Sequence, residues 1–156
     1  MILIEKAQTG DCGSVLMLLE DILRIHHSGR PDIFASSGAK YTAENLESIF
    51  SDPDTPSFVI REDGEFRGYA LCQIKRSKGT PPLCPSVVLY IDDLCVSSDQ
   101  RGRGLGSALL EHIIKTAKEL GCCRVELNVW EFNEGARRLY ERFGFSTQKR
   151  QLEYLL

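Results

Sequence analysis

The sequence lacks the patterns that mark several common functional classes. Its six cysteines include no Cys-x-x-Cys pair and no metal-ligand spacing, so we expect reduced thiols and no metal site. Positive charge is not in excess: the formal net charge is −3, which argues against general binding of nucleic acid. Long apolar runs are also missing. The apolar start Met1–Ile4 is far too short for a signal peptide or membrane anchor, and charged residues follow it at once. We therefore expect no membrane anchor and a cytoplasmic location.

Internal repeats, low-complexity segments and linkers are absent as well. A chain of 156 residues is long enough to bury one proper hydrophobic core. We expect a single domain over residues 1–156.

The most informative segment present is glycine-rich: Gln100-Arg101-Gly102-Arg103-Gly104-Leu105-Gly106. It lies between an apolar stretch and an amphipathic one, so it predicts a tight turn from a strand into a helix. Three glycines at alternate positions leave main-chain N–H groups uncovered, and a helix N-terminus attracts anions. The P-loop spacing is absent, and the third glycine of a dinucleotide fingerprint is replaced by Ser107.

The remaining pattern, Arg-x-x-Gly-x-Gly, is met by Arg101, Gly104 and Gly106. It resembles motif A of the GNAT family of N-acetyltransferases, whose loop binds the pyrophosphate of acetyl-coenzyme A (acetyl-CoA). The alternative is a glycine-rich turn that binds nothing. The resemblance implies acetyl-CoA as cofactor and assigns these residues to its binding: Arg101, Gly102, Arg103, Gly104, Leu105, Gly106 and Ser107.

A second motif follows downstream. Asn133 is a natural helix N-cap, apolar residues then repeat at helical spacing, and Gly144 is placed to end the helix. An Asn, a Tyr seven residues later and a Gly-Phe pair resemble motif B of the same family. The resemblance implies that Asn133 and Ala136 contact the pantetheine arm and that the Tyr140 hydroxyl lies near the thioester sulfur. Structurally, Asn133 could be only a cap and Tyr140 only a core aromatic.

The family implies an α/β GNAT fold: a mixed central β-sheet with a splayed pair of parallel strands and flanking helices. Periodicity and turn signals agree with the order β-α-α-β-β-β-α-β-α-β. The expected strands and helices are 2–7, 11–30, 42–50, 57–61, 66–75, 86–96, 105–120, 123–129, 133–143 and one closing strand within 146–156. Family members place two strands after the Gly-Phe pair. A single closing strand leaves an exposed edge, so we predict a homodimer through it.

The resemblance also assigns the chemistry. Leu94, Cys95 and Val96 would hold the pantetheine through their main chain, where the parallel strands separate. One of these N–H groups would polarise the acetyl oxygen. Tyr140 is the candidate general acid for the departing thiolate.

Asp92 and Asp93 are adjacent carboxylates in an otherwise apolar strand, and strict alternation would send them to opposite faces. Their segment resembles that of diamine acetyltransferases, where the first acid lines the acceptor site. Asp92 would then bind or deprotonate the amine, directly or through water, whereas Asp93 either contacts substrate or holds a neighbouring loop. His27, Asp32 and Trp130 are further candidate acceptor contacts, the last with core packing as an equal alternative.

We therefore expect an enzyme that transfers acetyl from acetyl-CoA to a primary amine of a small molecule, by direct attack within a ternary complex. Acetylation of a protein N-terminus or lysine is one alternative. A non-catalytic acyl-CoA-binding regulatory domain is the other.

Overall fold

A five-stranded sheet forms the centre of the molecule in the computed structural model, which describes residues 1–156. The strands lie in chain order across the sheet, and all neighbours are antiparallel except the last pair, β4 and β5. Asp63 and Gly64 form the predicted β2–β3 turn and both have positive φ, as a two-residue hairpin requires. The strand bounds are β1 Ile2–Lys6, β2 Ser57–Glu62, β3 Glu65–Ser77, β4 Ser86–Val96 and β5 Arg124–Leu127.

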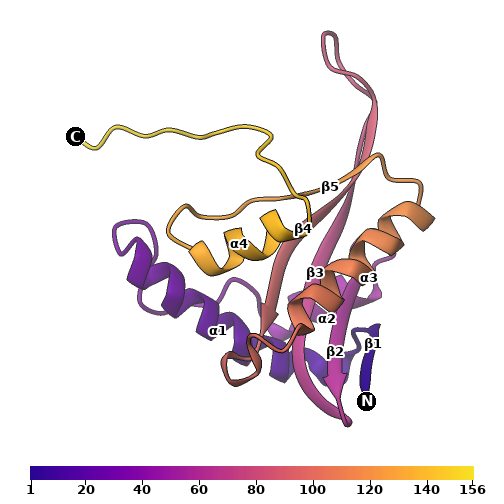
Figure 1. The fold of residues 1–156 in the computed structure, drawn as a ribbon, viewed down its shortest axis with the longest axis vertical. Helices are drawn as coiled ribbons and strands as arrows, with labels where there is room; N and C mark the ends of the chain where they lie inside the picture. Colours follow the sequence, from indigo (N-terminus) through magenta and orange to yellow (C-terminus); the bar gives the residue numbers. More distant parts are fainter.

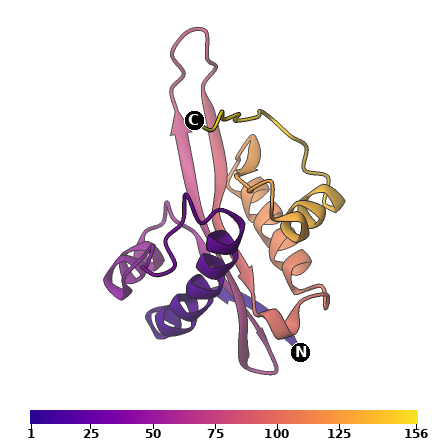
Figure 2. The ribbon, with the colours of Figure 1, turned by 90° about the vertical axis from the view of Figure 1, so that its left-hand side faces the viewer.

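Helices cover both faces of this sheet, and Figure 2 shows α1 and α2 on one side with α3 and α4 on the other. Thr42 caps α2 as predicted, since its hydroxyl oxygen accepts a hydrogen bond from the Asn45 N–H at 3.1 Å. Gly144 follows α4 with a φ of +91°, which confirms the predicted helix end. The bounds are α1 Cys12–Gly29, α2 Ala43–Ser51, α3 Leu105–Glu119 and α4 Glu134–Arg142.

Two hydrophobic cores result, one on each face of the sheet. The α3 core contains five fully or nearly fully buried α3 side chains packed on β2, β3 and β4, and α4 adds Leu139 and Tyr140 to its edge. The α1 core joins α1 and α2 to side chains such as Tyr69 and Leu71 on β3. The α/β expectation is therefore confirmed. None of the helices is long and apolar enough to cross a membrane.

A bulge in β4 changes which side chains face each core. Leu71 pairs with Asp93, but the next residue, Cys72, pairs with Ile91, so Asp92 is an extra residue in β4. Because a bulge interrupts alternation, Ile91 faces α3 whereas both following acids face the α1 side. The prediction that the two acids point to opposite faces was therefore wrong.

The parallel strands separate beyond this bulge. β5 pairs with β4 only from Val88 to Ile91, while β4 continues to Val96. Residues 92–96 therefore have β3 on one side and no strand on the other. This confirms the predicted splayed pair, and it leaves main-chain polar groups of β4 open to a ligand.

The predicted closing strand is absent, because residues 146–156 contain no regular secondary structure. Figure 1 shows this tail leaving α4 and running away from the sheet. Its polar run Gln148–Gln151 offers no apolar face to pack on a helix, and Glu153 pairs instead with Arg30 at the end of α1. The outer edge of β5 therefore has no partner strand.

Candidate active site

A cavity of about 1510 Å³ opens where β4 and β5 separate. Its walls come from one face of α1, the loop between α1 and α2, the end of β4, the first turn of α3, the β5–α4 connection and α4. Most of the predicted site residues line it: Asp92, Asp93, Leu94, Cys95, Val96, Arg101, Gly102, Gly104, Leu105, Gly106, Ser107, Trp130, Asn133, Ala136 and Tyr140. Arg103, His27 and Asp32 do not.

The glycine-rich loop forms one end of this cavity. Gly104 is the N-cap of α3 with a φ of +83°, and no side chain caps the helix, so its first N–H groups are available to an anion. Arg101 and Arg142 line the cavity and take part in none of the ion pairs of the structure. Arg103 turns away and forms two hydrogen bonds with Glu62, at 2.7 and 2.8 Å. Two unpaired cations and a helix N-terminus thus face the same space.

Helix α4 brings Asn133 and Tyr140 to the cavity wall. Asn133 is also the N-cap, since its Oδ1 accepts a hydrogen bond from the Ala136 N–H at 3.3 Å. Tyr140 packs edge-to-face on Phe145 with ring centroids 5.7 Å apart. Burial, aided by the negative charge of Asp93, raises the pKa of Tyr140 to about 12. The phenol therefore remains a hydrogen-bond donor at neutral pH.

The two acids form a charged cluster with the loop between α1 and α2. Asp92 accepts hydrogen bonds from Lys40 Nζ at 3.0 Å and from the Tyr41 hydroxyl, and Lys40 Nζ lies 3.7 Å from Asp93 Oδ2. Burial raises the pKa of Asp93 to about 6, and the negative charge of Asp92 adds to this although Lys40 opposes it. On β3, the buried Tyr69 hydroxyl has no hydrogen-bond partner.

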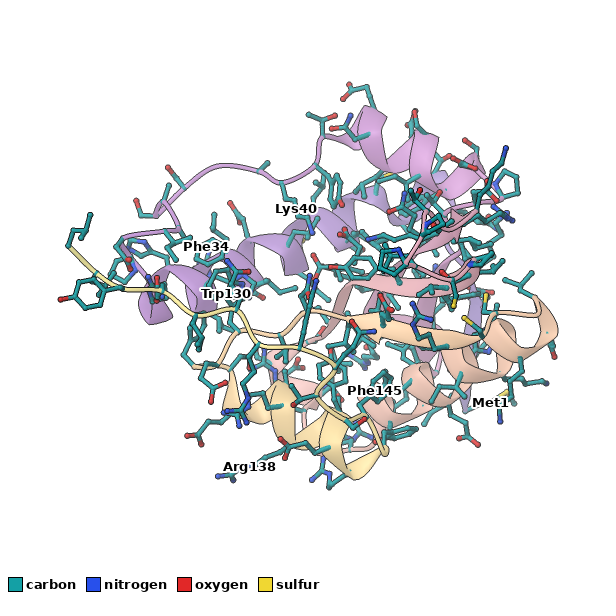
Figure 3. The ribbon with its side chains drawn as sticks, turned by 90° about the horizontal axis from the view of Figure 1, so that it is seen from above. Met1, Phe34, Lys40, Trp130, Arg138 and Phe145 are labelled. Carbon is teal, nitrogen blue, oxygen red and sulfur yellow. The ribbon has the colours of Figure 1, made fainter.

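Aromatic side chains form the rim on the α1 side. Phe34 and Trp130 lie side by side (Figure 3) and meet edge-to-face with centroids 5.2 Å apart. Trp130 also stacks on Phe132, with centroids 5.9 Å apart. Gly29 makes room for this cluster, because a Cβ at that position would lie 2.4 Å from the Phe132 ring. The rim joins the end of α1 to the segment before α4, so it closes one wall of the cavity.

The other two acceptor candidates lie behind this rim. His27 Nδ1 is 2.7 Å from the main-chain oxygen of Phe34. Asp32 accepts two hydrogen bonds from Arg30, at 2.7 and 2.8 Å, and this pairing lowers the pKa of its carboxyl. Both side chains therefore stabilise the turn that carries Phe34.

Comparison with known proteins identifies this arrangement. The acetyltransferase (GNAT) family profile matches residues 19–145. The chain belongs to the GNAT family.

A thialysine N-epsilon-acetyltransferase from Bos taurus is 29% identical over 92% of this chain and 83% of that protein. The [ribosomal protein bS18]-alanine N-acetyltransferase of Escherichia coli is 29% identical over 58% of this chain and 54% of that protein. A crystal structure of a BH1408 mutant protein from Bacillus halodurans superposes with a TM-score of 0.95, at 26% identity over 99% of both chains.

As a GNAT member the chain is an acetyl-CoA-dependent N-acetyltransferase, and its cavity suits that donor. The loop end of the cavity has the N–H groups and cations that a pyrophosphate needs, and the open side of β4 has main-chain groups for an amide-containing arm. Gly106 allows close packing at this end, since a Cβ there would lie 3.2 Å from Leu139. Tyr140 lines the same cavity as the glycine-rich loop and the two acids.

Sequence reasoning did not single out Lys40, Tyr41 and Arg142, which line the cavity. Lys40 and Tyr41 lie in an irregular loop, and no periodicity or motif marks such positions. Arg142 lies at the end of α4 and resembles any basic residue in the last turn of a helix. Only the folded chain brings them to the cavity.

Proposed function

We propose that this enzyme acetylates a primary amine on a small cationic molecule by direct attack within a ternary complex. The observation that carries the proposal is the acid pair Asp92 and Asp93. Both carboxylates line the cavity that also contains the anion-binding loop and Tyr140. Two carboxylates in a half-buried site favour an ammonium ion over a neutral or anionic acceptor. The bovine relative is named for an ε-amine on thialysine, which agrees with such an acceptor.

Acetyl-CoA supplies an activated thioester when bound, and the chain holds it at three places. Arg101, Arg142 and the α3 N-terminus would bind the phosphates, Asn133 would contact the pantetheine arm, and the main chain of Leu94–Val96 would pair with that arm. A main-chain N–H of this segment would donate to the acetyl oxygen, where negative charge develops during attack.

The acid pair binds the incoming ammonium and receives its proton. Moving a proton from an amine with a pKa of about 10.4 to a carboxylate with a pKa of about 6 is uphill by about 6 kcal/mol. This is small beside the barrier of roughly 17 kcal/mol that corresponds to one turnover per second. In this proposal Asp92 holds the amine, and Asp93, whose pKa is raised by burial, accepts the proton.

Tyr140 acts on the leaving sulfur. A phenol with a pKa of about 12 is a weaker acid than a thiol with a pKa of about 8.5, so complete proton transfer is uphill by roughly 5 kcal/mol. Its main contribution is therefore a hydrogen bond to the sulfur as negative charge develops there, followed by protonation of the thiolate.

The test is release of free coenzyme A thiol from acetyl-CoA in the presence of amine pools: polyamines, amino acids, aminoglycosides and N-terminal peptides. Turnover with one of the small-molecule pools supports the proposal. Turnover with peptides alone would replace the small molecule with a protein acceptor. Binding of acetyl-CoA without turnover in any pool would favour a regulatory binding domain.

We also infer a homodimer. The outer edge of β5 has no partner strand, and the tail, which forms no closing strand, carries the exposed side chains Leu152, Tyr154 and Leu155. Exposed strand edges and apolar segments are commonly covered by a second chain. Size-exclusion chromatography with light scattering should give twice the chain mass, and a monomer at micromolar concentration would contradict this.

A further inference from the structure

Lys40 places a primary amine of the protein itself on the acid pair. Its Nζ lies 3.0 Å from Asp92 Oδ2 and 3.7 Å from Asp93 Oδ2, the positions that the proposed function assigns to the acceptor ammonium. The side chain lines the same cavity as Tyr140 and the anion-binding loop. It is 48% exposed, so it is not locked into a buried ion pair. The structure therefore resembles an enzyme with an alkylamine already in its acceptor site.

The loop that carries Lys40 can move without unfolding the sheet. Residues 35–41 make no main-chain hydrogen bond to any part of the chain, and they form no helix or strand. Tyr41 is the firmer attachment, because its ring packs on the α1 core while its hydroxyl donates to Asp92. The Lys40 side chain is about half exposed and its loop makes no main-chain hydrogen bond, so it is free to carry its amine along the cavity while Tyr41 anchors the end of the loop.

No other lysine occupies an equivalent position. Lys75 Nζ lies over the Tyr90 ring at 3.5 Å, and Lys115 Nζ is 3.9 Å from Glu119 on the outer side of α3. Neither lines the cavity, and the remaining lysines do not line it either. Because Lys40 is the one lysine that lines the cavity, its position alone predicts that it is modified selectively.

We propose that Lys40 is a self-acetylation site: its own Nζ accepts an acetyl group within the cavity. This rests on the proposed function, because the same acids and Tyr140 would act on it. One ammonium proton passes to the acid pair and then to solvent. The nitrogen lone pair forms the N–C bond to the acetyl carbonyl carbon, and the C–S bond breaks with its electron pair on sulfur. The second nitrogen proton passes to solvent as the amide forms, and the thiolate takes a proton from the Tyr140 hydroxyl, which solvent reprotonates, so one proton is released overall. The products are an acetamide on Lys40 and coenzyme A thiol.

The modification removes the positive charge from the acid pair. An acetylated Lys40 no longer forms the ion pairs with Asp92 and Asp93, so the two carboxylates lose the one cation that they share in the unmodified chain. Self-acetylation is therefore a single turnover per chain, and it is intramolecular. Its first-order rate constant should not change when the protein is diluted tenfold.

The experiment incubates the full chain with acetyl-CoA and no added amine, and follows it by intact mass and peptide mapping. Lys40 should acquire one acetyl group at least ten times faster than the exposed Lys115, which reports uncatalysed acetylation. The matched variant Lys40→Arg keeps the positive charge beside the acids and should remain unmodified at that position. Tyr140→Phe should slow Lys40 acetylation without changing the rate at Lys115. Equal rates at Lys40 and Lys115, or a Lys40 rate that is unaffected by Tyr140→Phe, would overturn the proposal.

A parallel assay separates this inference from the proposed function. If the amine pools are acetylated while Lys40 stays unmodified, self-acetylation is wrong and the proposed function stands. If acetyl-CoA does not bind by calorimetry, both fail together. If acetyl-CoA binds and Lys40 still stays unmodified, self-acetylation is again wrong, because this acceptor is present in every molecule.

Discussion

The donor end and the acceptor end of the cavity are built in different ways. At the donor end, one continuous segment from Arg101 to Ser107 forms the turn and the first helical N–H groups. At the acceptor end, Lys40 and Asp92 are 52 residues apart and meet only through their side chains. Main-chain sites are specified locally by glycines, whereas side-chain sites depend on the whole fold. The glycine-rich loop of the donor end should therefore tolerate changes elsewhere in the chain, whereas the contact of Lys40 with the acids should not.

Tyr140→Phe tests the point where the two ends meet, and it should have the largest effect. Loss of the hydroxyl removes the donor to the leaving sulfur, so turnover should fall by about 100-fold or more while the acetyl-CoA affinity changes little. Coenzyme A thiol release and calorimetry measure these quantities. Tyr154→Phe, on the exposed tail, is the control. Equal turnover in the wild type and Tyr140→Phe would remove the phenol from the mechanism.

Asp93→Asn tests how far the buried, ionised carboxylate of Asp93 lowers the stability of the folded chain. Burial raises the folded-state pKa of Asp93 from its ordinary 3.8 to about 6, so the folded chain binds more protons than the unfolded chain between these values. The stability contribution of this carboxyl therefore decreases as the pH rises through that window, by up to about 3 kcal/mol. Above pH 6 the variant should be more stable and less active than the wild type.

Denaturant unfolding at about pH 4 and pH 8 measures this difference in stability. Near pH 4 the two proteins should have similar stability, because the carboxyl is then largely protonated in the folded chain. A variant that is less stable at both pH values would show that Asp93 stabilises the fold.

Arg101→Gln tests the donor end alone. Loss of a charge-assisted hydrogen bond to phosphate is worth about 1.5–3 kcal/mol, so the Kd for acetyl-CoA should rise roughly 10- to 100-fold. Turnover at saturating acetyl-CoA should be nearly unchanged. Arg138→Gln is the matched control, because Arg138 lies on α4 outside the cavity and pairs with Glu134. Equal Kd values for the two variants would contradict the assignment.

Gly29→Ala tests the aromatic rim and has the smallest expected effect. A Cβ at Gly29 would overlap the Phe132 ring, so the ring must shift, which should cost about 1–3 kcal/mol of stability. Gly13→Ala lies in the same helix with no atom within 4 Å of the new Cβ, and it should stabilise by about 0.5–1 kcal/mol. Denaturant midpoints compare the two variants. Similar midpoints would show that the rim accommodates the methyl group.

Much of this fold could be predicted from the sequence because its signals are local. The helix that includes Leu105 and Leu109 has a clear 3.6-residue period, and Thr42 and Gly144 mark helix ends through their own chemistry. The run from Ser86 to Val96 is apolar enough to indicate a buried strand, and its bounds match those of β4. The donor end of the site follows from the same local patterns.

What could not be predicted depends on contacts between distant segments. The β4 bulge is set by pairing with β3, so the shared orientation of Asp92 and Asp93 carries no sequence signal. The tail does not pair with the sheet: Glu153 forms an ion pair with Arg30, more than a hundred residues earlier in the chain, and no local pattern marks that contact. Lys40 reaches the acids from an irregular loop.

The most direct test of the account measures the two ends of the cavity separately in Asp92→Asn. With the acceptor identified from the amine pools, kcat/KM for that amine and the Kd for acetyl-CoA are compared with the wild type. The account predicts that kcat/KM falls at least tenfold, because a charge-assisted hydrogen bond to the ammonium is lost, while Kd changes less than about twofold. An unchanged kcat/KM, or an equal loss in both quantities, would contradict an acceptor site built on the acid pair.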